Sequence, residues 1–260
     1  MELGLNGKVA VITGGSRGIG LAVARLLAAE GAEVAIVARD TDTLGSASQH
    51  IKEQTGREPL AIRADVSIPE DIRIAVAETV ERFGRIDILI NNAGTAAARP
   101  FEEVEADAWT ADLDLKLFGA VHFSQAVLPY MRKAGGGAIV NVTAIGGKTP
   151  SASSLPSSVS RAAGLALTKA MSKDLAADRI RVNAVCIGLI RSAQIEKMWQ
   201  KNAPELSWDE FASDPRHNIP LGRIGRTEEA ANVIGFLVSE AASFVTGTSV
   251  NIDGGISSVL

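Results

Sequence analysis

The sequence has only one cysteine, Cys186, so it cannot form an intramolecular disulfide bond. This excludes a secreted scaffold held together by disulfides and favours a cytoplasmic location. The first residues lack the basic start and the apolar stretch of a signal peptide. No later run approaches about 18 uncharged apolar residues, so we expect no membrane-spanning helix.

The chain also lacks a region where charge of one sign is concentrated. Its 26 basic residues are scattered and are offset by 30 acidic ones, for a formal net charge of -4. Binders of nucleic acid or anionic membranes usually carry a basic stripe, so we expect neither partner. With 260 residues, 46% of them hydrophobic, the chain is long enough to bury a large core, and no linker or repeat divides it. We therefore expect a single domain over residues 1–260.

Short apolar, β-branched runs alternate with longer stretches of helical periodicity. This alternation is typical of βαβ units, in which helices cover both faces of a parallel sheet. The sequence thus predicts a doubly wound α/β fold of about seven strands. The expected strands are Val9–Thr13, Glu33–Ala38, Leu60–Ala64, Ile86–Asn91, Ala138–Thr143, Arg181–Cys186 and Ser249–Asp253.

The sequence also predicts several helices and one flap. Ser67-Ile68-Pro69-Glu70 fits a capping box, and Thr227 fits the N-terminal cap of a helix that runs to Ser239. A long helix is expected over Asp107–Arg132. We interpret Ser192–Arg226 as an irregular flap over a substrate pocket.

A glycine-rich turn follows the first expected strand. It reads Thr13-Gly14-Gly15-Ser16-Arg17-Gly18-Ile19-Gly20 and leads into a helical stretch, Leu21–Glu30. Glycines permit positive φ and a close approach to a pyrophosphate, and a helix N-terminus offers free N–H groups. A merely tight turn is the alternative, but the strand before it and the helix after it favour a dinucleotide site.

Together with three further motifs, this turn resembles the short-chain dehydrogenase/reductase family, especially its 3-oxoacyl-carrier-protein reductase-like members. The motifs are Asp65-Val66, Asn91-Asn92-Ala93-Gly94 and Asp253-Gly254-Gly255. The resemblance covers essentially the whole chain and implies a Rossmann-type fold and a small-molecule substrate. It also implies a homotetramer built on the long helix and on a helix beginning near Ser157, with the C-terminal strand as a second contact. With the arginines discussed below, the expected cofactor site comprises Gly14, Ser16, Arg17, Gly18, Ile19, Gly20, Arg39, Asp65, Val66, Asn91, Ala93, Gly94 and Arg161.

The end of the second expected strand bears on the choice of cofactor. Members of the family that prefer NAD usually carry an acidic residue where this chain has Ala38, because a carboxylate binds the ribose 2′-hydroxyl and repels a 2′-phosphate. Arg39 and Arg17 instead offer guanidinium groups to a 2′-phosphate, so we predict NADP(H). If both arginines are only solvated and Asp40 reaches the ribose, the cofactor is NAD(H).

The usual catalytic residues of the family are all replaced. Ordinary members use Ser, Tyr, Lys and Asn, and the corresponding positions here hold Ala144, Ser157, Arg161 and Lys116. The only tyrosine, Tyr130, lies in the preceding long helix and cannot take over. A serine hydroxyl is far less acidic than a phenol, whose pKa is about 10, and Arg161 stays protonated. We find no spacing typical of metal ligands.

Lys116 is the first candidate for the missing proton donor if burial and Arg161 lower its pKa, whereas a lysine projecting into solvent is the alternative. We expect an NADP(H)-dependent oxidoreductase that acts on a carbonyl or alcohol and reduces the usual acyl ketones poorly. Two other functions stay open. One is a regulatory or assembly protein that binds the dinucleotide, and the other is a non-redox enzyme that uses the same pocket.

Overall fold

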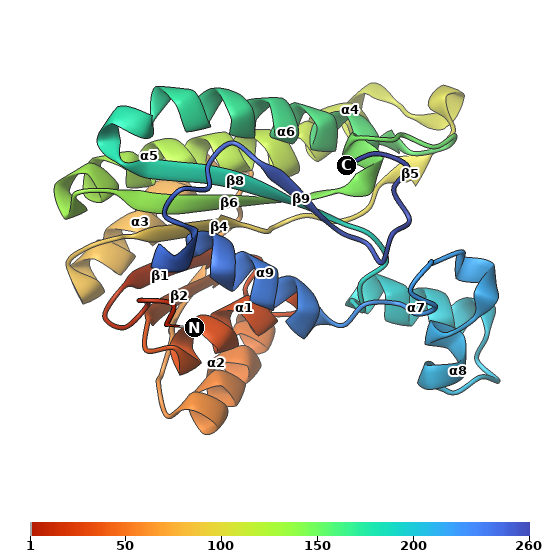
Figure 1. The fold of residues 1–260 in the computed structure, drawn as a ribbon, viewed down its shortest axis with the longest axis horizontal. Helices are drawn as coiled ribbons and strands as arrows, with labels where there is room; N and C mark the ends of the chain where they lie inside the picture. The colour runs from red at the N-terminus through yellow and green to blue at the C-terminus, as the bar shows by residue number, and fades with distance from the viewer. Residues whose placement is uncertain (1) are drawn as a thin grey trace.

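The structure, a computed structural model, describes residues 2–260 and centres on a seven-stranded parallel sheet of order β3-β2-β1-β4-β6-β8-β9 (Figure 1). Every predicted strand is present, and the predicted Rossmann-type α/β fold is confirmed. The strands are β1 (Val9–Thr13), β2 (Glu33–Ala38), β3 (Leu60–Arg63), β4 (Ile88–Asn91), β6 (Gly137–Ala144), β8 (Ile180–Ile187) and β9 (Ser249–Ile252). None of the helices within residues 2–260 is long and apolar enough to cross a membrane.

Helices cover both faces of the sheet (Figure 1). On one face lie α1 (Gly18–Ala29), α2 (Thr41–Thr55) and α9 (Thr227–Val238). On the other lie α3 (Pro69–Phe83), α4 (Ala106–Leu113), α5 (Gly119–Ala134) and α6 (Ser157–Asp174). Short 3-10 turns occupy Phe101–Glu103, Ile145–Gly147, Ala176–Asp178, Pro215–His217 and Glu240–Ala242.

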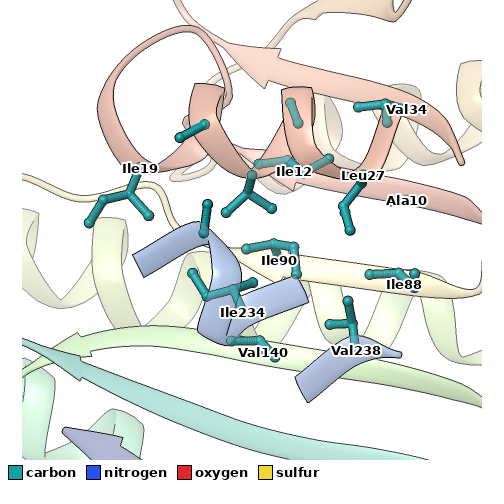
Figure 2. Packing of buried hydrophobic residues seen from close by; sticks show 14 of the residues in the cluster. Ala10, Ile12, Ile19, Leu27, Val34, Ile88, Ile90, Val140, Ile234 and Val238 are labelled. Carbon is teal, nitrogen blue, oxygen red and sulfur yellow. The ribbon is translucent and has the colours of Figure 1, made fainter. Parts of the chain in front are cut away.

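Because both faces are covered, alternate residues of each strand enter separate cores. Ile12 of β1 packs with Ile234 of α9 in one core, as Figure 2 shows. Val11, its neighbour, packs with Phe123 of α5 in the other. This two-sided burial explains why the strands read as continuous apolar runs.

Two predicted helix caps are wrong. The Ser67 hydroxyl donates to the Asp65 carboxylate, and α3 begins at Pro69, whose fixed φ suits the first turn of a helix. Thr227 is already inside α9, whose N-terminal cap is Arg226. In both places the hydroxyl donates to a nearby carboxylate and does not cap the helix by accepting from its N–H groups.

The predicted long helix is continuous but changes its geometry in the middle. Between α4 and α5, the segment Asp114–Phe118 forms a π-helical turn, which contains Lys116. Such turns occur frequently at functional sites because they shift the direction of the following side chains. Tyr130 lies on α5 and packs against the core on that face.

The predicted flap is more regular than expected. It contains α7 (Ala193–Asn202) and α8 (Trp208–Ala212), which lie to one side of the sheet in Figure 1. Trp199, Trp208 and Phe211 form a small separate core there, so tertiary packing orders a segment without clear periodicity. A two-stranded antiparallel ribbon, β5 (Ala98–Arg99) and β7 (Leu155–Pro156), joins the loops that precede α4 and α6.

Candidate active site

The glycine-rich turn lies where the order of the strands reverses, between β1 and β4. In open α/β sheets, ligands bind at this crevice beyond the carboxyl ends of the strands. Thr13 links β1 to the end of β4 at this crevice. Its hydroxyl donates to the carbonyl of Ile90 and accepts from the N–H groups of Asn92 and Ala93 at 2.9 and 3.0 Å. The Asn92 amide in turn donates to the carbonyl of Thr13 at 2.9 Å.

The turn itself fits a pyrophosphate. Gly14 and Gly18 have φ values of +64° and +55°, a region that favours glycine. A Cβ on Gly20 would overlap the carbonyl oxygen of Gly14, so a larger residue would push α1 away from β1. No side chain caps the N-terminus of α1, and its first turn holds no acidic residue. Its N–H groups are therefore available to an anion.

The predicted 2′-phosphate site lies at the end of β2. Arg39 is 67% exposed and lies 3.6 Å from the Asp65 carboxylate at the end of β3. Arg17 is exposed as well. Asp40, the alternative ribose ligand, caps α2 and accepts from the Thr43 N–H at 2.8 Å. The guanidinium groups of Arg17 and Arg39 are thus accessible, whereas the Asp40 carboxylate caps a helix.

Four other predicted cofactor residues line a single cavity. Ala93, Val66 and Arg161 line one cavity, between β4, β6 and α6. Asn91 also lines it, but its amide group donates to the side chain of Asn141 at 2.9 Å, and its own Oδ1 is buried without a protein partner. Asn91 therefore joins β4 to β6 and is also part of the cavity wall.

The structure brings Lys116 and Ser157 together. Lys116 is buried, with 8% of its surface exposed, so the solvent-exposed alternative is wrong. Its Nζ donates to the Ser157 Oγ at 2.6 Å and also bonds the Asp112 carboxylate. The second carboxylate oxygen of Asp112 accepts from the Ser160 hydroxyl at 2.6 Å. A connected polar network thus crosses from α4 to α6.

Arg161 lies in the same cavity, one turn of α6 beyond Ser157. Its Nη1 donates to the Val142 carbonyl at 2.6 Å, and a Cβ on Gly94 would come within 3.0 Å of Nη2. Burial lowers the pKa of Arg161, while the Asp112 carboxylate opposes that shift. Ala144 ends β6 without a hydroxyl, so the position that orients a substrate oxygen in ordinary members has no polar group here.

Burial also lowers the pKa of Lys116. Asp112 opposes this effect by hydrogen bonding, and the positive charge of Arg161 reinforces it. The site therefore holds a buried lysine that is paired with Asp112 and a partly buried arginine whose positive charge acts on that lysine. Such a lysine is a better proton donor to an alkoxide than a solvated one.

Sequence reasoning missed Asp112 and Ser160. The spacing of four residues between Asp112 and Lys116 is a signal, because such residues lie on one helix face. It is a weak signal, since the same spacing is common on solvated helices. Across residues 2–260, no cluster of three or more His, Cys, Asp and Glu side chains is arranged to hold a metal.

Comparisons with known proteins agree with this geometry. The family description "Enoyl-(Acyl carrier protein) reductase" matches residues 14–257. The 3-oxoacyl-(acyl-carrier-protein) reductase FabG of Thermotoga maritima is 36% identical over 253 residues, covering 97% of this chain and 98% of that protein.

Two solved structures are similar over nearly their whole length. The L-sorbose reductase from Gluconobacter frateurii, complexed with NADPH and L-sorbose, has a TM-score of 0.94 and 36% identity, with 100% of both chains covered. A short-chain oxidoreductase from Pseudomonas aeruginosa PAO1, described as containing an atypical catalytic center, has a TM-score of 0.95 and 34% identity, with 99% of this chain and 100% of that chain covered. An NADPH-bound structure is also known for the latter protein.

The motifs, the strand order and these comparisons agree with one another along essentially the whole chain. The protein is therefore an oxidoreductase of the short-chain dehydrogenase/reductase family, similar to the 3-oxoacyl-carrier-protein reductases.

Proposed function

We propose that this protein is an NADP(H)-dependent reductase of a carbonyl substrate in which Lys116, acting through Ser157, replaces the usual tyrosine as proton donor. The observation that carries the proposal is the 2.6 Å contact between Lys116 Nζ and Ser157 Oγ at a buried site. It connects the two replaced positions that can bear a transferable proton.

The choice of NADP(H) rests on the end of β2. Arg39 and Arg17 are accessible, whereas Asp40 caps a helix. A guanidinium group suits a phosphate because its planar N–H donors match the oxygens. The NADPH in the similar structures of L-sorbose reductase and the Pseudomonas oxidoreductase supports the same choice. The cradle of Gly14, Gly18 and Gly20 would hold the pyrophosphate.

The serine is placed to pass a proton rather than to originate one. Ser157 Oγ accepts from Lys116 and also from the Ala97 N–H at 2.9 Å. A hydroxyl oxygen has two acceptor positions, so both are filled, and its own hydrogen is left to donate. Along the part of the chain that the structure describes, no protein acceptor takes that hydrogen.

Reduction of the carbonyl requires one hydride and one proton. NADPH, when bound, supplies the hydride that converts the carbonyl carbon to an alcohol carbon. The developing alkoxide oxygen accepts a proton from the Ser157 hydroxyl, and the Ser157 oxygen accepts a proton from the Lys116 ammonium. No free serine alkoxide forms, so the high pKa of a serine hydroxyl does not limit the step. Lys116 ends neutral and regains a proton from solvent before the next turnover.

Arg161 contributes charge rather than a proton, because a guanidinium does not deprotonate in a protein. Its positive charge lies in the cavity where negative charge develops on the substrate oxygen. It also lies beside Gly94, on the side of the cavity where the nicotinamide ribose is expected. We assign it to holding the cofactor and stabilising the alkoxide.

The test combines binding with turnover. NADPH and NADH are titrated by calorimetry, and a panel of ketones, ketoses and 3-oxoacyl thioesters is screened for NADPH oxidation with the parent and with Lys116→Gln. The glutamine can still donate to Asp112 but cannot release a proton. Lys148→Gln is the control, since Lys148 is partly buried and bonds Ser249 and Asn251 on β9. We expect turnover by the parent and the control only.

Binding of NADPH without turnover of any panel member by the parent would instead favour a regulatory or assembly protein. Turnover of the same substrate by Lys116→Gln at the parental rate would overturn the assignment of the proton donor. If neither NADPH nor NADH binds, the cofactor site as a whole is wrong.

We further propose that the protein is a homotetramer in the cytoplasm. Phe118 and Val159 are exposed apolar side chains, 45% and 43% accessible, and lie on the π-helical turn and on α6. These helical segments pack against each other and provide an apolar face for a symmetry mate. Light scattering at micromolar concentration should give four chains, and a strictly monomeric particle would overturn this assignment.

A further inference from the structure

Asp112 is a buried carboxylate that the reaction described above does not consume. It lies on α4, and only 4% of its surface is exposed. One oxygen bonds Lys116 Nζ, and the other accepts from the Ser160 hydroxyl at 2.6 Å. Buried carboxylates are costly unless they are paired and hydrogen-bonded, so both of these contacts matter for its placement.

The two contacts tie the lysine to the helix that carries the serine. Asp112 precedes Lys116 by four residues, across the junction between α4 and the π-helical turn. Ser160 lies one turn after Ser157 on α6. The carboxylate thus fixes the Lys116 ammonium from one side while α6 presents the Ser157 hydroxyl from the other. A lysine side chain otherwise has four rotatable bonds and no single preferred direction.

We propose that Asp112 is a positioning residue that holds the Lys116 ammonium on Ser157 and keeps it protonated for the reaction. The proposal rests on the proposed function, in which Lys116 supplies the proton. Asp112 touches neither substrate nor cofactor in this role, since it acts through the lysine.

The charges around Lys116 support this role. Two ionisable side chains act on it, Asp112 from α4 and Arg161 from α6. Burial and Arg161 favour the neutral amine, whereas Asp112 favours the ammonium. Without the carboxylate, nothing in contact with Lys116 would oppose the first two effects.

The test is Asp112→Asn, which keeps the shape of the side chain but removes its charge and turns one of its two acceptor atoms into a donor. The ketone identified in the screen is used, and kcat/KM is measured from pH 5 to 10. We expect kcat to fall about 10–100-fold, as when a reacting group is misplaced by about 1 Å. We also expect the high-pH decline of kcat/KM to move down by about one pH unit or more, because one opposite charge is lost. The KM for NADPH should change little.

A merely structural ion pair would lower the melting temperature without moving the pH profile. Ser160→Ala provides a second variant that keeps the charge but loses the bond that directs it. It should lower kcat several-fold and leave the high-pH decline in place, and it keeps the proposal testable if Asp112→Asn does not fold. The role of Asp112 would be overturned by a folded Asp112→Asn with the parental kcat and an unmoved pH profile. If that variant does not fold, a Ser160→Ala variant with the parental kcat would overturn it.

Failure of this inference is distinguishable from failure of the proposed function. If Lys116→Gln is inactive while Asp112→Asn and Ser160→Ala behave like the parent, Lys116 is the donor but Asp112 does not position it. If Lys116→Gln is fully active, the proposed donor itself is wrong, and the role of Asp112 falls with it.

Discussion

Replacing Arg39 by aspartate should reverse the cofactor preference. Arg39 follows β2 directly and is 67% exposed, and its carboxylate neighbour is Asp65 at 3.6 Å. A charge-assisted hydrogen bond to a phosphate contributes about 1.5–3 kcal/mol. The guanidinium is largely solvated, and its surface ion pair with Asp65 contributes only about 0–1 kcal/mol. We therefore take the lower end of that range for the contact between Arg39 and the 2′-phosphate of NADPH. A loss of about 1.5 kcal/mol corresponds to about tenfold weaker binding.

The introduced carboxylate adds two further effects. It repels the 2′-phosphate and accepts hydrogen bonds from the ribose hydroxyls of NADH. We therefore expect the ratio of NADPH to NADH affinity to fall by about 10–100-fold, measured by calorimetric titration of both cofactors. Arg57→Asp is the matched control, because it makes the same charge change where Arg57 pairs with Glu33 at the opposite end of β2. Equal affinity of the parent for the two cofactors, or an unchanged ratio in Arg39→Asp, would refute the reasoning.

Three further outcomes are expected. Gly20→Ala should abolish NADPH binding, because its Cβ would overlap the Gly14 carbonyl. The control Gly45→Ala, in open space on α2, should bind NADPH normally, and its free energy of unfolding in denaturant should rise by about 0.5–1 kcal/mol. Glu229 accepts hydrogen bonds from Arg223 and from the Arg226 N–H, which lower its pKa from 4.5 to about 2. Its contribution to stability is present above pH 4.5 and is lost as the pH falls toward 2, so Glu229→Gln should remove that part of the acid dependence in thermal melts. The triple variant Ala144→Ser, Ser157→Tyr, Arg161→Lys should gain 3-oxoacyl thioester reductase activity that each single change lacks, unless the parent already turns over at about 1–1,000 per second.

The sheet and the glycine turn could be predicted because local sequence determines them. Ile12 and Val11 are both buried, so strands covered on two faces read as unbroken apolar runs. The glycines of the turn are needed for backbone geometry, and only glycine meets that need at Gly14 and Gly20. These requirements leave a direct mark on the sequence.

The helix cap at Ser67 and the helices of the flap could not be predicted, because contacts from elsewhere determine them. Ser67 has the right spacing for a capping box, yet its hydroxyl donates to the Asp65 carboxylate, and Ile68 is the residue that precedes the helix. The flap is ordered by packing among Trp199, Trp208 and Phe211, which no local periodicity reveals.

The proposed proton-transfer network could be predicted only in part. The resemblance to the family indicates the four replaced positions, Lys116 and Ser157 among them. The contact between them depends on the π-helical turn and on the burial of Asp112, which an isolated helical pattern does not indicate. A buried ion pair at four-residue spacing has the same sequence signature as a solvated one.

The most direct test of Lys116 as proton donor is the pH dependence of kcat/KM for the parent and for Lys116→Gln. Reduction needs the protonated lysine, so the parental rate should decline at high pH, at a value below 10.5 because burial lowers the pKa of Lys116. The variant should be slower by about 100–10,000-fold, the usual contribution of a general acid, and should lose that decline. A variant with the parental rate and the same decline would contradict a role for Lys116 in proton transfer.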